Sequence, residues 1–101
     1  MAGPVAKGRK FASKIGLPKF VISDAGHANG TRMRDYVDFI NEGSDKNALL
    51  VECGTHWATE TADLAIKSAY RLLDIMGMID EDLVRQFGPS EEELTTQTFV
   101  E

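Results

Sequence analysis

The sequence predicts an α/β domain that contains a parallel pair of strands. Residues 48–51 form an unbroken apolar run that leads into Glu52, and Gly54 ends it. Such a run is typical of a strand that is buried on both faces. Residues 59–76 then carry apolar side chains at helical spacing, and residues 19–23 form a second strand-like run behind an earlier helix. This alternation of helices and strands favours a parallel sheet.

The first predicted unit is a helix followed by a strand. Residues 5–15 have helical spacing, Gly16 provides a stop signal, and Pro18 follows where a helix cannot continue. Residues 19–23 (Lys-Phe-Val-Ile-Ser) are then expected to form a short core strand.

Residues 24–47 form a long connection between the two predicted strands. Small and turn-forming residues over 24–31 indicate a loop, residues 33–40 are compatible with a short amphipathic helix, and residues 41–45 are again rich in turn formers. Connections of this length more often carry functional residues than serve only to join two elements.

The helix over residues 59–76 is the best defined in the sequence. Thr59 is its expected N-cap, Gly77 closes it, and its apolar stripe is wide enough to cover a sheet face. Residues 78–87 predict a short helix, and residues 95–100 have strand-like composition.

Composition limits the classes of partner. The chain has 101 residues and a net charge of −5, which argues against a nucleic-acid or anionic-membrane partner. The basic residues between Lys7 and Lys19 are interpreted as a solvated helix face. Cys53 is the only cysteine, so an internal disulfide is excluded. No membrane-length apolar run or signal peptide is evident, and a cytoplasmic location is expected.

Glu52 is the first candidate for chemistry. A carboxylate at the end of a buried strand faces the crevice in which α/β proteins bind ligands, and burial there would raise its pKa toward that of a general base. The alternative is a surface carboxylate that pairs with a lysine or caps the next helix.

Arg32 and Arg34 are candidates for binding an anion. Arginines in a loop of small residues suit a bidentate grip on a carboxylate or phosphate, although Asp35 and Asp38 could simply neutralise them. His27 and His56 are the only histidines, and their spacing is a weak zinc signal, so ordinary hydrogen-bonding roles are favoured.

The segment Leu50-Val51-Glu52-Cys53-Gly54-Thr55-His56-Trp57, together with residues 24–32, resembles the succinylglutamate desuccinylase/aspartoacylase family of zinc-dependent hydrolases. These are relatives of the zinc carboxypeptidases, and the resemblance spans roughly residues 10–77. It implies part of a three-layer α/β/α fold with a central, largely parallel sheet.

The resemblance also implies roles for individual residues. Glu52 matches the family's general base, which acts on a zinc-bound water, and Arg32 matches the arginine that grips a substrate carboxylate, with Arg34 as the fallback. The family's zinc ligands lie upstream of the matched region, and neither His27 nor His56 matches them. Zinc is therefore expected in the parent enzyme, whereas the isolated chain is expected to hold none and to be inactive.

These inferences lead to three hypotheses. In the first, residues 1–79 are the C-terminal half of a catalytic domain that cleaves N-acyl amino acids or similar small carboxylates, and residues 80–101 begin the following region as linker plus strand. Its partners are the small substrate, the rest of the domain and possible further copies of the chain. In the second, the chain is a non-catalytic structural or self-associating α/β module. In the third, Arg32 and Arg34 bind anionic metabolites without turnover.

Overall fold

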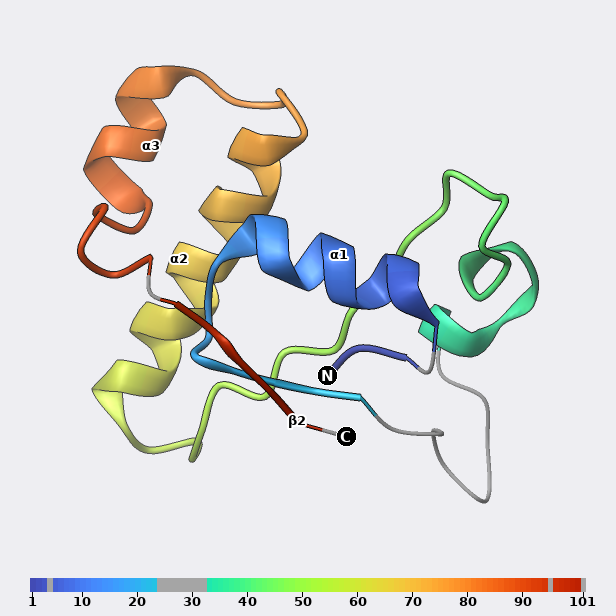
Figure 1. Cartoon of the computed structure of the whole chain (residues 1–101). Helices are drawn as coiled ribbons and strands as arrows, with labels where there is room; N and C mark the ends of the chain where they lie inside the picture. The colour runs from blue at the N-terminus through green and yellow to red at the C-terminus, as the bar shows by residue number, and fades with distance from the viewer. Residues whose placement is uncertain (4, 24–32, 95, 101) are drawn as a thin grey trace.

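A computed structural model describes residues 1–3, 5–23, 33–94 and 96–100 of the chain. It combines helices with a two-stranded parallel sheet, so the general α/β class is confirmed. Figure 1 shows α1 above the two strands, and α2 and α3 beside each other. The elements, in order, are α1 (Ala6–Ile15), β1 (Phe20–Ile22), the 3-10 helices η1 (Met33–Asp35) and η2 (Val37–Phe39), α2 (Thr59–Ile75), α3 (Glu81–Phe87) and β2 (Thr98–Val100).

The predicted helix–turn–strand unit is confirmed. α1 ends where Gly16 adopts a left-handed conformation, with φ of 79°, and donates its N–H to the carbonyl of Ala12 at 3.2 Å. Glycine suits this position because a side chain would be strained there. Arg71 of α2 donates to the carbonyls of Lys14 and Ile15, both at 3.1 Å, so a cation also satisfies the last turn of α1.

The strand pairing differs from the predicted one. β1 pairs in parallel with β2, in the register Phe20 to Thr98 and Ile22 to Val100, and Ala2 forms an isolated bridge to Ser23 on the other side of β1. The expected neighbour of β1 was the run over residues 48–53. The strand-like composition of residues 95–100 instead marked the true partner.

The prediction of a buried strand over residues 48–53 is wrong. No strand is assigned there. Leu50 donates its N–H to the carbonyl of Met1 at 3.2 Å, and the Met1 ammonium donates to the carbonyl of Leu50. The place beside β1 is taken by Ala2, whose N–H donates to the carbonyl of Ile22 at 2.8 Å. An apolar run reports a tendency toward burial, and it does not specify a pairing partner.

The expected role of α2 as the cover of a sheet is also wrong. Ile66 and Met76 of its predicted stripe are 50% and 58% exposed, and Ser68 is the one buried residue of the helix. α2 contacts α1 and α3. The core lies instead where α1 meets β1 and contains Ala2, Ala12 and Val21, with Leu49 packed against it.

Boundaries of the remaining elements follow local signals with two exceptions. Gly77, with φ of 69°, ends α2 as predicted, but the N-cap is Ala58 rather than Thr59, and it makes no side-chain cap bond. Residues 33–40 form two 3-10 helices rather than one amphipathic helix, and Val37, the first residue of η2, has φ of 44°. A positive φ at a β-branched residue interrupts regular helix geometry.

Candidate functional site

Glu52 lies on an extended segment that borders an apolar groove. The flanking side chains of Val51 and Cys53 line that groove, whereas Glu52 does not and is exposed to solvent. Successive side chains of an extended chain point to opposite sides, which accounts for this division. The burial that the sequence predicted for Glu52 is therefore wrong, and its carboxylate is presented on the outer side of the segment.

Arg34 takes a structural position. Its side chain is nearly fully buried, Nη1 donates to the carbonyl of Ala2 at 2.7 Å, and Nε lies 3.4 Å from a carboxylate oxygen of Asp35. Part of the predicted alternative, neutralisation by Asp35, is thus observed. Arg34 holds the N-terminal residues beside β1. Arg32 and His27 lie outside the described residues.

His56 and Trp57 follow Glu52 in a turn before α2, and both are exposed. Trp57 is 94% exposed, which is unusual for the largest apolar side chain. The described contacts give this pair no structural role.

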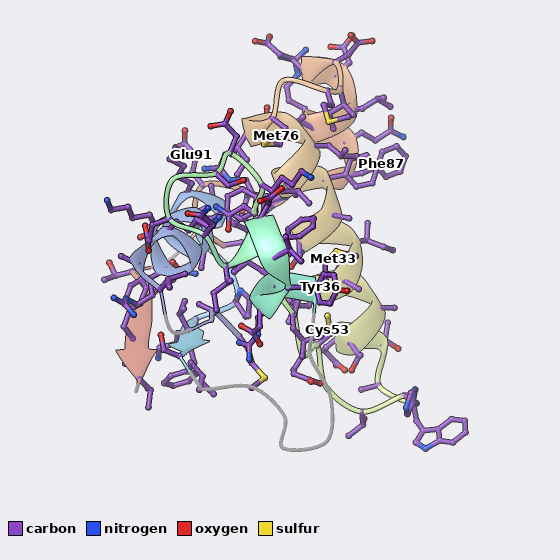
Figure 2. The ribbon with its side chains drawn as sticks, turned by 90° about the vertical axis from the view of Figure 1, so that its right-hand side faces the viewer. Met33, Tyr36, Cys53, Met76, Phe87 and Glu91 are labelled. Atoms are coloured by element: carbon purple, nitrogen blue, oxygen red, sulfur yellow. The ribbon has the colours of Figure 1, made fainter. Side chains whose placement is uncertain are left out.

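The groove beside α2 has a volume of ≈ 650 Å³. Figure 2 labels two of its lining residues, Cys53 toward the N-terminal end of α2 and Met76 at its C-terminal end. Its walls are mostly apolar, and the buried hydroxyl of Ser68 has no hydrogen-bond partner among the described residues. The lining residues are Phe11, Ile15, Asn47, Ala48, Leu49, Val51, Cys53, Ala65, Ser68, Ala69, Leu72, Leu73, Met76 and Met78.

Lys7 was interpreted from the sequence as part of a solvated face, and this is wrong. Its ammonium group donates to four backbone carbonyls, one in η2 and three in the loop that follows it. The acceptors are Asp38 at 3.0 Å, Asn41 at 2.5 Å, Ser44 at 3.4 Å and Lys46 at 2.7 Å. No local signal could have revealed this cage, because its carbonyls lie more than 30 positions away in the sequence.

A second, basic hollow of ≈ 420 Å³ lies at the carboxyl ends of β1 and β2. It is lined by Arg9, Lys10 and Ser13 of α1 and by Ser23, Phe99 and Val100. Neither Arg9 nor Lys10 forms an ion pair within the described residues. These two side chains therefore leave a concentration of positive charge at the end of the sheet where α/β proteins commonly bind ligands.

Opposite charges join α2 to the turn before β2. Lys67 forms ion pairs with Glu93 and with Asp63, the latter at 2.9 Å. The hydrogen bonds that the Lys67 ammonium donates to the carboxylates of Glu93 and Asp63 raise the pKa of Lys67. The Lys67 ammonium and the Ser90 N–H in turn hold the pKa of Glu93 below its usual value of 4.5. Ser90 donates its N–H to Glu93 at 3.1 Å, as the capping-box spacing suggests, but only one turn forms there.

The described residues do not fit a zinc site. Nowhere among them do three or more His, Cys, Asp or Glu side chains come together as a metal-binding group. A catalytic zinc ion requires three protein ligands. Within the same residues, no helix is both long enough and apolar enough to cross a membrane.

Comparisons with models of protein families, with curated proteins and with solved structures gave no significant match to this chain.

Proposed function

We propose that the chain is a segment of a zinc-dependent amidohydrolase that cleaves the amide bond of N-acyl amino acids or similar small carboxylates. Glu52 is its general base. In this proposal residues 1–79 are part of a catalytic domain with a three-layer α/β/α fold, and residues 80–101 begin the next region. The proposed location is cytoplasmic.

The presentation of Glu52 is the observation that carries this proposal. Its carboxylate projects to solvent from an extended segment whose neighbouring side chains, Val51 and Cys53, are directed into the groove. A general base needs this accessibility, because it must come within hydrogen-bond reach of the proton that it removes. The resemblance of residues 50–57 to a family with a glutamate base adds support from the sequence.

In this proposal the chain supplies that base and, through Arg32, the grip on the substrate carboxylate. Glu52 would take a proton from the attacking water and return it to the leaving amine. Since the zinc ligands of the family that the sequence resembles lie upstream of the matched region, the ion would be held by other residues of the parent enzyme. The 101-residue chain alone is therefore expected to bind no stoichiometric zinc in metal analysis and to leave N-acyl amino acids intact.

The decisive test uses the polypeptide encoded by the complete open reading frame. Glu52→Gln is expected to lower kcat by roughly 10²–10⁴-fold on N-acyl amino acids while the melting temperature stays close to wild type, because only proton transfer is lost. Glu60→Gln is the matched control, since Glu60 is also exposed and lies in the first turn of α2. A Glu52→Gln variant with near wild-type turnover would remove Glu52 from the mechanism.

The second candidate function, a self-associating α/β module without catalysis, is favoured by the exposed sheet. Phe20 and Phe99 are 56% and 46% exposed, although parallel sheets are normally covered on both faces.

A further inference from the structure

The outer edge of β2 offers a matched pair of backbone groups. On the inner side, Thr98 donates its N–H to the carbonyl of Lys19 and Val100 accepts from the N–H of Ser23, both at 2.8 Å. The direction of the backbone groups alternates from residue to residue along a strand. The N–H and carbonyl of Phe99 therefore point away from β1, where no described residue pairs with them.

This pattern suits a second copy of the same edge. When two antiparallel strands meet, directly opposite residues exchange both of their backbone hydrogen bonds. With a twofold axis at Phe99, each copy would donate its Phe99 N–H to the Phe99 carbonyl of the other, as an isologous interface requires. The two short sheets would become one four-stranded sheet.

Pairing would also improve a sheet that is marginal by itself. Each strand has three residues, and isolated two-stranded sheets are rarely stable. Ile22 and Val100 at the carboxyl ends are 42% and 43% exposed. A second sheet beside β2 would cover part of this apolar surface.

The distribution of charge along the sequence indicates that a second copy of the chain binds at the outer edge of β2. The first 23 residues contain no Asp or Glu and five basic residues, Lys7, Arg9, Lys10, Lys14 and Lys19. The turn before β2 contains Glu91, Glu92 and Glu93, of which Glu93 pairs with Lys67. Glu91 and Glu92 are exposed and form no ion pair within the described residues.

The antiparallel arrangement brings these opposite charges toward each other. The residues that precede β2 in one copy run past the carboxyl ends of the strands in the other, and Arg9 and Lys10 line the hollow at those ends. Figure 1 shows β2 beside β1, with α1 above them. We propose that two copies of this chain associate through antiparallel β2 edges centred on Phe99, with the acidic turn of each copy facing Arg9 and Lys10 of the other. The proposal is independent of the amidohydrolase function.

The first test is sedimentation equilibrium of the whole chain. A monomer–dimer equilibrium is expected, and its Kd should rise when NaCl is increased from about 50 mM to about 500 mM, because exposed charges are then screened. Phe99→Pro is expected to raise Kd at least about 10-fold, because it removes the outward donor and leaves the bonds to β1 in place. Phe99→Val, which keeps the N–H, is its control.

Charge reversal keeps the proposal testable if Phe99→Pro fails to fold by circular dichroism. Arg9→Glu with Lys10→Glu is expected to weaken the dimer, and adding Glu91→Lys with Glu92→Lys is expected to restore it. Lys14→Glu with Lys19→Glu changes the net charge equally in the last turn of α1 and just before β1, and it should weaken the dimer less. A chain that stays monomeric at low salt, or a dimer that Ala69→Lys in the groove disrupts while the Phe99 and charge variants do not, would overturn the proposal.

Discussion

Ser68 is a polar residue in an otherwise apolar environment. It is 8% exposed, it lines the groove, and its hydroxyl has no hydrogen-bond partner among the described residues. A buried hydroxyl without a partner loses its hydration and gains nothing in exchange. The unpaired hydroxyl therefore lowers the free energy of unfolding, and no contact among the described residues compensates for this loss.

Ser68→Ala is therefore expected to stabilise the chain. The gain should be about 1 kcal/mol in the free energy of unfolding, from the removed hydroxyl and from the higher helix propensity of alanine. Denaturant unfolding would measure it. Ser13→Ala on α1 changes the propensity alone, because Ser13 is exposed, and should gain less. Equal gains for the two variants would contradict a burial penalty at Ser68.

Lys7 shows the opposite case, a charged side chain that organises a loop. Lys7→Met is expected to lower the free energy of unfolding by about 1–2 kcal/mol, because four carbonyls lose a charged donor. Hydrogen exchange should accelerate for amides between residues 38 and 47. Lys14→Met is the control, since Lys14 lies exposed on the same helix. If exchange in the loop does not change, the cage contributes nothing to its order.

At the scale of elements, Lys67 and Glu93 join α2 to the turn before β2, and this link depends on pH. The pKa of Glu93 is lowered on folding, so its contribution is complete above the unfolded value of 4.5 and is lost as pH falls through the folded value. The pKa of Lys67 is raised, so the contribution is also lost as pH rises beyond 10.5. The largest cause of both pKa shifts is the hydrogen bond between Lys67 and Glu93.

The difference in the free energy of unfolding between wild type and Lys67→Met should thus be largest between pH 4.5 and pH 10.5. Urea unfolding at a series of pH values would show the difference narrowing below pH 4.5 and again above 10.5. Arg85→Met provides the comparison, because Arg85 pairs only within α3. A difference that does not vary with pH would argue that Lys67 stabilises the chain by packing.

Elements could be predicted from the sequence where their signals are local. Gly16 and Gly77 end α1 and α2 because left-handed geometry favours glycine within one turn of chain. The partner of β1 could not be predicted in this way, since β2 lies about 78 positions away and residues 48–53 carried the stronger apolar signal. The position of Glu52 after that run was visible in the sequence, but its exposure depends on what packs beside the run.

For the whole molecule, the buried apolar set is small relative to the apolar surface that remains exposed. Within the described ranges, the buried hydrophobic residues are Ala2, Ala12, Ile15, Leu17 and Val21. A groove of ≈ 650 Å³ stays open beside α2. Surfaces of this kind normally mark a binding site or an interface.

An apolar dye is therefore expected to bind the folded chain. 8-Anilinonaphthalene-1-sulfonate should gain fluorescence in native buffer, and Leu72→Gln or Ala69→Gln in the groove should reduce that gain. Leu83→Gln on α3 is the control, because Leu83 is exposed and does not line the groove. If the dye gains no fluorescence in the presence of the folded chain, the groove is closed in solution.

Trp57 is the only tryptophan in the chain, and it is 94% exposed five residues after Glu52. Its emission in the free chain should lie near that of a water-exposed indole and be open to collisional quenchers. Any partner that covers the Glu52 side of the extended segment would shift this emission to the blue and slow the quenching. The protein thus carries its own optical reporter at the position where the proposed base meets solvent.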